Sequence, residues 1–510
     1  MSALDRSAIV AVIGAGAMGA GIAQVAARAG HPVVLHDNRQ GAARAAIAGI
    51  DTQLAKRVAA GKLDAAAHQA CLANLSAANG LQDLAGASLV IEAIVENLAV
   101  KRALFAELEC LCRADCILAS NTSSLSITTL AAELQHPERL LGLHFFNPAP
   151  VMALVEVISG LASDPALART LHATAKAWGK KPVLARSTPG FIVNRVARPF
   201  YAESLRLLQE GAADCATLDA LLREAGGFRM GAFELTDLIG HDVNYAVTCS
   251  VFDAYYHDMR FQPSLIQKEL VDAGHLGRKS GRGFYDYREG AQRPAVQTLN
   301  SDALIDCAVV EGDLGVLAPL LERLGASGID LTVRAGNGLL RVGEAVLALS
   351  DGRLASQRAR EDGLANLILL DLALDYRSAT RLGISWAQGT AQAAIDQAVA
   401  VLARAGISAS ALSDTPGLCV LRTVAMLANE AADAQLQGVA SAADIDLAMC
   451  AGVNYPLGPL AWAHAIGTGS VVTVLQHLQA AYGEERYRPS LQLRRSLTAN
   501  TLLALETSHE

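Results

Sequence analysis

The sequence has no uninterrupted apolar run long enough to cross a membrane, and its first residues, M-S-A-L-D-R, lack the apolar core of a signal peptide. Its nine cysteines are scattered, with no C-x-x-C pair and no histidine cluster beside the closest two, Cys110 and Cys112. We therefore expect neither a metal site nor a disulfide framework, and reduced thiols favour the cytoplasm. The net charge of −8 disfavours nucleic acid but leaves room for a phosphorylated ligand held by local lysines.

What the chain does contain is typical of a large helix-rich enzyme. Its 510 residues favour about three or four domains. With 52% hydrophobic and 18% charged residues, it has enough apolar side chains for several cores.

The N-terminal segment has the pattern of a dinucleotide-binding unit. A β-branched run, Ala8–Ile13, leads into the glycine loop G-A-G-A-M-G, an alanine-rich segment and a second strand, Pro32–His36, which ends in Asp37. Such a loop lets backbone amides approach a pyrophosphate at a helix N-terminus, and a carboxylate at the position of Asp37 binds a ribose 2′-hydroxyl and repels a 2′-phosphate. The pattern predicts NAD rather than NADP, despite Arg39 nearby. The loop residues expected at the cofactor are Gly14, Gly16, Ala17, Met18 and Gly19.

Polar side chains gather where two later strands end. The β-like runs Cys116–Ser120 and Leu140–Phe145 are each followed by polar residues, and ligands of open α/β sheets bind at the carboxyl ends of strands. Ser123, His144 and Asn147 are therefore expected to face one crevice. Glu156, on the next β-like run, is placed to reach His144, and a carboxylate behind a histidine is a usual arrangement for a general base.

The signature H-F-F-N-P-A-P-V-M-A-L-V-E that contains His144 closely resembles the 3-hydroxyacyl-CoA dehydrogenase family, and the resemblance extends to about Gly290. It implies that His144 is the catalytic base, that Glu156 orients it and that Ser123 holds the substrate hydroxyl. The neighbouring hydroxyls of Thr122 and Ser124 could equally cap a helix, so only the family register selects Ser123. In the motif T-P-G-F-I-V-N-R, the resemblance gives Asn194 a contact with the substrate near the reacting carbon.

The same resemblance implies further contacts, each of which has an ordinary structural alternative. It places Glu96, Lys101, Asn121, Asn147 and Lys279 at the cofactor, and Lys56 and Lys62 at the phosphates of coenzyme A. Asparagines at such positions also stabilise turns, a glutamate often begins a helix, and lysines often form a solvated basic face.

The last third of the chain repeats the middle. Thr188-Pro189-Gly190 recurs as Thr415-Pro416-Gly417, an offset of 415 − 188 = 227, and the register continues without gaps to Gly240. In the second copy Asp371 stands in place of His144, Gly383 in place of Glu156 and Leu421 in place of Asn194, and no glycine loop precedes them. We therefore expect the second copy to be catalytically silent.

These patterns predict an α/β Rossmann-like NAD-binding lobe, an all-α helical domain, a degenerate α/β lobe and a second helical domain. The expected boundaries are 1–187, 188–290, 291–413 and 414–510. Related dehydrogenases pair their helical domains between two subunits, so the tandem copy predicts a monomeric pseudo-dimer, with a homo-oligomer as the alternative.

The reaction that the resemblance implies is NAD-dependent oxidation of a (3S)-3-hydroxyacyl-CoA. The acyl chain is expected to be 3-hydroxyadipyl, as in phenylacetate breakdown, or 3-hydroxybutyryl. A terminal carboxylate would need an arginine, for which Arg198 and Arg229 are candidates, with surface solvation as the other interpretation of both. Oxidation of a free hydroxy or sugar acid and a non-enzymatic NAD-binding role remain as alternatives. A purely structural role is disfavoured because it would not need all four predicted site residues, which are intact: Ser123, His144, Glu156 and Asn194.

Overall fold

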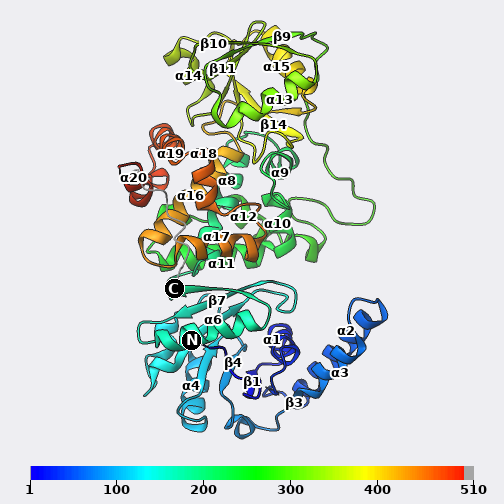
Figure 1. Cartoon of the computed structure of the whole chain (residues 1–510), viewed down its shortest axis with the longest axis vertical. Coiled ribbons are helices and arrows are strands. Elements are labelled where there is room, and N and C mark those ends of the chain that lie inside the picture. Colours follow the sequence, from blue (N-terminus) through cyan, green and yellow to red (C-terminus); the bar gives the residue numbers. More distant parts are fainter. Residues whose placement is uncertain (1, 499–510) are drawn as a thin grey trace. The chain divides into compact units, whose positions relative to one another are not determined.

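The computed structural model of the chain describes residues 2–498, which divide into two compact units. The first unit comprises the chain up to Arg195 together with Ala434–Val453, and the second comprises Val196–Asp433 and the segment that starts at Asn454. Each unit has its own β-sheet (Figure 1). Within residues 2–498, no helix is both long and apolar enough to span a bilayer.

The sheet of the first unit has eight strands in the order β3-β2-β1-β4-β5-β6-β7-β8. Neighbouring strands are parallel except for β6 and β7, which run antiparallel. The order reverses between β1 and β4, the position at which doubly wound sheets bind dinucleotides. The strands are β1 Val10–Ile13, β2 Val33–His36, β3 Leu75–Ala77, β4 Leu89–Glu92, β5 Ile117–Ser120, β6 Leu140–Phe145, β7 Leu154–Ser159 and β8 Lys181–Arg186.

The helices of this unit cover a sheet whose central strands are buried on both faces, as their nearly continuous apolar sequences require. They are α1 Ala17–Arg28, α2 Ala42–Ala59, α3 Ala65–Ala73, α4 Leu98–Leu111, α5 Ile127–Ala131, α6 Pro165–Ala177 and, from the far end of the chain, α17 Ala442–Val453. Helix α17 packs against β7 and β8. The amide of Arg186 donates to the carbonyl of Val439 at 2.8 Å, so a segment of the second copy supports the edge of the first sheet.

The second unit contains most of both helical lobes. The first lobe consists of α8 Arg198–Gln209, α9 Cys215–Glu224, α10 Ala232–Ile239, α11 His241–Ala254 and α12 Leu265–Asp272. The second consists of α18 Pro459–Ile466, α19 Thr468–Tyr482, α20 Leu491–Thr498 and most of α16 Val420–Leu436. The first lobe also contains the short helical turn η3 Met259–Phe261, and the second lobe contains the short helical turn η6 Glu485–Tyr487.

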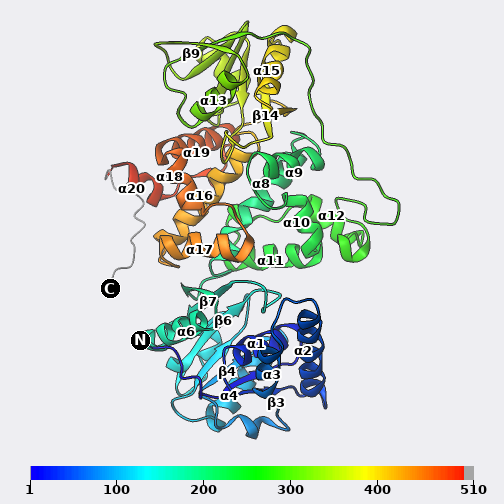
Figure 2. The ribbon, with the colours of Figure 1, turned by 45° about the vertical axis from the view of Figure 1, so that its right-hand side comes forward.

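Helices α8 and α16 of the two lobes lie side by side in both views (Figure 1, Figure 2). The buried Arg422 of α16 donates to Glu203 of α8 at 2.7 Å. The rings of Phe228 and Trp462 lie 5.6 Å apart, which joins the two lobes through aromatic contacts as well. The two helical lobes therefore pack against each other inside one chain.

The sheet of the second unit confirms the predicted degenerate α/β lobe. Its strands are β9 Cys307–Glu311, β10 Asp330–Arg334, β11 Leu339–Val342, β12 Ala345–Leu349, β13 Leu367–Leu370, β14 Arg381–Trp386 and β15 Ser408–Ala411, and its helices are α13 Ala318–Ala326, α14 Ala355–Asp362 and α15 Gln392–Arg404. The strand order is β10-β9-β11-β12-β13-β14-β15. From β12 to β15 the pairing is parallel, antiparallel and parallel, as it is from β5 to β8.

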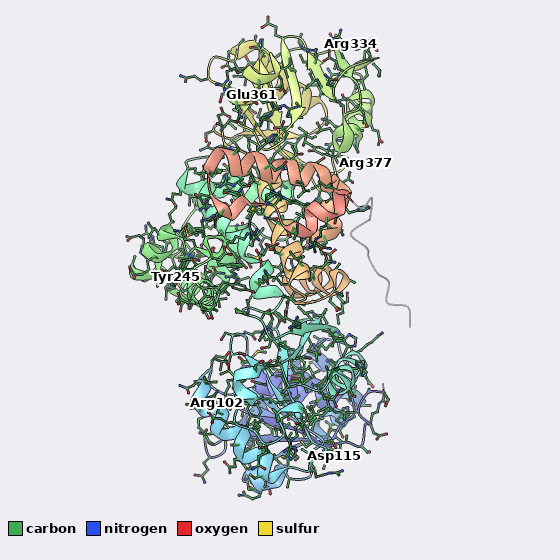
Figure 3. The ribbon with its side chains drawn as sticks, turned by 90° about the vertical axis from the view of Figure 1, so that its left-hand side faces the viewer. Arg102, Asp115, Tyr245, Arg334, Glu361 and Arg377 are labelled. Carbon is green, nitrogen blue, oxygen red and sulfur yellow. The ribbon has the colours of Figure 1, made fainter. Side chains whose placement is uncertain are left out.

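Several arginines of this lobe lie on its surface and pair with its own acids. Arg334 and Arg377, labelled in Figure 3 with Glu361, are exposed. Arg377 contacts Glu322 at 3.2 Å, and Arg353 contacts Glu361 at 3.0 Å. The pair of Arg377 and Glu322 is exposed on both sides, and such a pair contributes little to stability but keeps the surface hydrated.

The degenerate lobe contains a buried carboxylate that performs a structural task. Asp371, which follows β13 at the position of His144 in the first copy, accepts hydrogen bonds from the amides of Cys419, Val420 and Leu421 at 2.8–3.0 Å. These amides begin α16, where a helix has no carbonyl partners for its N–H groups. Burial raises the pKa of Asp371 to about 6, and the amides partly offset that rise. At neutral pH the side chain is therefore an ionised acceptor that fixes α16 to the sheet.

We expect Asp371→Ala to lower the free energy of unfolding by about 3 kcal/mol or more, because several buried amides lose their acceptor. Urea denaturation of the two proteins measures the difference. Asp375→Asn, at a side chain that is 43% exposed, is the matched control and should stay close to the wild type. A loss in Asp371→Ala no larger than in the control would show that Asp371 does not anchor α16.

Candidate active site

The glycine loop between β1 and α1 has the geometry that a dinucleotide requires. Gly14 has a φ of +104°, and a Cβ there would lie 2.4 Å from the carbonyl oxygen of Ala93. A Cβ on Gly16, in contrast, would meet nothing within 4 Å, so this position is open to a ligand. A cavity of about 550 Å³ is lined by the loop, by the end of β2 and by the start of α4, which fits the adenosine half of a dinucleotide.

Asp37 follows β2 and lines the same cavity. Its side chain is only 8% exposed and accepts from the amide of Ala15 at 2.7 Å and from Nε of Arg39 at 3.0 Å. The Arg39 guanidinium, more than the Ala15 amide, lowers the pKa of Asp37 to about 2. Since this pKa is below the ordinary carboxyl range, Asp37 keeps its negative charge at every pH above about 4. Any contribution of this charge to the stability of the fold is therefore fully present above about pH 4.

We expect the preference for NAD over NADP to depend on this charge. Asp37→Ala should lower the ratio of kcat/KM with NADH to that with NADPH by roughly 10- to 10²-fold, because a charge-assisted hydrogen bond to the ribose is lost while Arg39 remains. In the wild type the ratio should not change between pH 7.5 and pH 9, where Asp37 and the 2′-phosphate of NADPH both keep their charge. Absorbance assays with both cofactors measure it, and an unchanged ratio in the variant would assign the preference elsewhere.

His144 and Glu156 form a buried pair across two antiparallel strands. They are direct partners in the register of β6 and β7, and Nδ1 of His144 lies 2.7 Å from Oε2 of Glu156. Their side chains are 7% and 1% exposed. Because a carboxylate oxygen accepts, Nδ1 carries the proton, and Nε2 is left as the nitrogen that can take a proton from a substrate.

The second oxygen of Glu156 extends this arrangement to the next helix. Oε1 accepts from the amides of Ile192 and Val193 at 3.1 and 3.0 Å, and Val193 begins the short helix α7 (Val193–Val196), which carries Asn194. One carboxylate therefore orients the imidazole and fixes the backbone beside Asn194. The contact of Glu156 with these amides corresponds to the contact of Asp371 with the amides at the start of α16 in the second copy.

Ser123 lies in a loop that is braced by a second buried ion pair. Lys101 of α4 is 1% exposed and contacts Oε1 of Glu92 at 2.7 Å and Oε2 of Glu96 at 3.0 Å. The other oxygen of Glu96 accepts from the hydroxyl of Thr122 and from the amide of Ser123 at 3.2 Å. Glu92 is not among the residues predicted from the sequence, although a carboxylate at the end of an otherwise apolar strand could have indicated it. This network holds Ser123 at the carboxyl end of β5, the edge of the sheet where β6 also ends.

The remaining predicted site residues have simpler surroundings. The side-chain oxygen of Asn121 accepts from the amide of Phe145 at 2.8 Å and so joins the ends of β5 and β6. Asn147, Lys56 and Lys62 are exposed. Lys279, in the second unit, contacts Asp242 at 2.5 Å. Ligand contacts of these residues stay a prediction.

Comparisons with known families match almost the whole chain. The sequence model of the 3-hydroxyacyl-CoA dehydrogenase NAD binding domain matches residues 9–188, and that of the C-terminal domain of the same enzymes matches twice, over 190–287 and 417–505. A reduced Rossmann-fold domain of 3-hydroxybutyryl-CoA dehydrogenase matches residues 347–416. The double match is the internal repeat that the offset of 227 residues predicts.

Individual relatives agree with these matches. A 3-hydroxyadipyl-CoA dehydrogenase of Escherichia coli K12 is 46% identical over 95% of this chain and 96% of its own length. A 3-hydroxybutyryl-CoA dehydrogenase of Clostridioides difficile is 39% identical over 55% of this chain and 99% of its own. A crystal structure described as 3-hydroxybutyryl-CoA dehydrogenase from E. coli K12 superimposes with a TM-score of 0.89, at 44% identity and over 98% of this chain and 99% of the other.

Proposed function

The chain belongs to the 3-hydroxyacyl-CoA dehydrogenase family and is an NAD-dependent oxidoreductase of 3-hydroxyacyl-CoA thioesters, and from this premise we propose that its substrate is (3S)-3-hydroxyadipyl-CoA. The full-length similarity to the E. coli 3-hydroxyadipyl-CoA dehydrogenase supports this acyl chain, because that relative shares the degenerate lobe and the second helical lobe as well. We also propose a place in phenylacetate breakdown, as the sequence resemblance implies.

The observation that carries the proposed chemistry is the buried contact of 2.7 Å between His144 and Glu156. Nε2 of His144 takes the proton of the 3-hydroxyl group, and Glu156 stabilises the imidazolium that forms. Ser123 and Asn194 hold the substrate oxygen, so that the C3–H bond has a fixed direction. Bound NAD supplies the hydride acceptor. Glu96 and Lys101 keep the Ser123 loop in place.

The test is the absorbance of the nicotinamide after the protein is mixed with NADH and either 3-oxoadipyl-CoA or acetoacetyl-CoA. We expect both thioesters to be reduced, with the higher kcat/KM for 3-oxoadipyl-CoA. A clear preference for acetoacetyl-CoA would replace the proposed substrate by 3-hydroxybutyryl-CoA. That second candidate is favoured by the name given to the structural relative that superimposes over the whole chain.

For the whole chain we propose a monomeric pseudo-dimer with the four domains that the sequence predicts. The packing of the two helical lobes inside one chain supports it, through contacts such as the buried pair of Arg422 and Glu203. Light scattering should give the mass of one chain, and a stable dimer would contradict the proposal.

All nine cysteines are free thiols, which supports our proposal of a reducing, cytoplasmic location.

A further inference from the structure

The helical part of the second unit contains a cavity of about 360 Å³ that the proposed reaction does not use. Helices α8 and α11 and the turn η3 of the first helical lobe form its walls, together with the end of α19 and the turn η6 of the second lobe. All of its lining residues belong to this one compact unit. A cavity of this volume accommodates a small organic molecule. Four arginines line it: Arg198, Arg206, Arg260 and Arg486.

Three of the four arginines have carboxylate partners. Arg206 contacts Glu484 at 3.0 Å, and Arg486 contacts the same carboxylate at 3.2 Å. Arg260 pairs with two acids of α16. Glu210, the other acid that lines the cavity, contacts an arginine of α16 at 2.9 Å. These charges compensate one another without a ligand.

Arg198 differs from the other three, because no carboxylate pairs with it in the part of the chain that the structure describes. It is 5% exposed, its Nη1 donates to the hydroxyl of Thr248 at 3.1 Å, and its guanidinium lies 4.9 Å from the ring centre of Tyr201. Burial lowers the pKa of Arg198, as expected for a cation that lacks a counter-charge. The interpretation of Arg198 as a solvated surface residue is therefore wrong, whereas Arg229 is exposed. A contact of either arginine with an acyl chain stays a prediction.

Several buried polar atoms on the lining of this cavity lack a partner. Nε of Arg198, Nε of Arg260 and Oγ of Ser264 are buried, and among residues 2–498 none of the three has a hydrogen-bond partner. Buried polar groups are normally hydrogen-bonded, so such a group calls for an explanation. Two of the three atoms can only donate. A ligand that accepts hydrogen bonds and carries negative charge would satisfy both the donors and the charge of Arg198.

The rest of the lining restricts which anion fits. Two carboxylates line the same cavity, and they would repel a dianion more strongly than a monoanion. The side chains of Tyr201, Leu205 and Phe261 add apolar surface, which favours a hydrocarbon body over a hydrated inorganic ion. A planar guanidinium matches a carboxylate through two parallel hydrogen bonds, and burial strengthens such a contact.

We propose that this cavity binds a small organic monocarboxylate, with the carboxylate on Arg198 and the hydrocarbon part against Tyr201, Leu205 and Phe261. The ligand provides the counter-charge that the protein itself does not supply. Because both helical lobes form walls of the cavity, a bound ligand also stabilises their packing and raises the melting temperature. This site needs neither NAD nor a thioester, so the proposal does not depend on the proposed acyl substrate.

The test uses hexanoate as the probe and the full-length protein without NAD or a thioester, at constant ionic strength. Isothermal titration calorimetry should show binding of hexanoate, and differential scanning fluorimetry should show a higher melting temperature in its presence. Hexanamide has the same chain length but no charge, and it should bind at least about 10-fold more weakly. Equal binding of hexanamide would overturn the proposal. Equal binding of sulfate would also overturn it, in favour of a general anion site.

Variants then locate the binding site. Arg198→Met, whose side chain fills much of the same volume, should weaken hexanoate binding roughly 10- to 10²-fold. Because no carboxylate pairs with Arg198, this substitution leaves no acid unpaired and should not lower the melting temperature. Arg198→Lys keeps the charge and should lose less affinity. Arg229→Met removes the same charge from an exposed position of the same lobe and should bind hexanoate as the wild type does. Wild-type affinity for hexanoate in Arg198→Met would overturn the assignment of the site.

Discussion

His144→Asn is expected to reduce kcat on the order of 10²–10⁴-fold, because an asparagine side chain cannot take up the hydroxyl proton. Asparagine keeps an N–H donor toward Glu156, so that the buried carboxylate does not lose its partner. The substitution therefore tests proton transfer rather than folding. Turnover of a 3-hydroxyacyl-CoA with NAD, followed by nicotinamide absorbance, measures the effect.

A histidine outside the site provides the control for this experiment. His136 also contacts a carboxylate, Glu138, at 3.2 Å, but both side chains are more than half exposed. His136→Asn should leave kcat unchanged. If His144→Asn retained wild-type turnover, His144 would not be the base, and the chemistry of the site would need another proton acceptor.

Glu156→Ala is expected to reduce kcat by roughly 10²-fold and to destabilise the fold at the same time. The imidazole loses the partner that fixes its tautomer, and the amides of Ile192 and Val193 lose their acceptor. Orphaned buried donors should lower the free energy of unfolding by about 2–5 kcal/mol. Enzyme assays and urea denaturation measure the two losses separately.

A second substitution separates the two tasks of Glu156. Glu156→Gln keeps one oxygen that can accept from the amides of α7, but its NH₂ group cannot accept the Nδ1 proton of His144. It should therefore lose most of the turnover with less loss of stability than Glu156→Ala. Glu133→Ala, at an exposed partner of Arg102, serves as the control and should lose neither. Unchanged turnover in Glu156→Gln would show that Glu156 acts only as an anchor of the helix.

Much of the fold was predictable because it depends on local patterns. The glycine loop, the apolar strands and the acid that ends β2 stand in an order that few other folds produce. The offset of 227 residues likewise identified the second copy, since a repeat retains its spacing even after its catalytic residues have changed. The contact between His144 and Glu156 followed from two adjacent strands whose register places them opposite each other.

Other features were not predictable, because they depend on contacts between distant segments. Asp371 was interpreted as the loss of a base, and the sequence did not indicate that it takes over the anchoring of the next helix. Nor did the sequence show that α17 lies against β7 and β8, since that packing joins residues more than 250 positions apart. From the sequence, Lys101 could equally have been a surface lysine near the start of a helix. Only the structure shows that it is buried between Glu92 and Glu96.

The sequence by itself determined the family and the cofactor, because these depend on residue types at fixed local spacings, and it predicted the residues that we propose carry the chemistry. The tertiary structure decided which charges are compensated. Arg198 and Arg206 lie on the same helix, and the sequence gives no reason to treat them differently. Among residues 2–498, however, Arg206 pairs with a carboxylate, Glu484, and Arg198 pairs with none. A buried charge is defined by what surrounds it, and those surroundings form only when distant segments pack together.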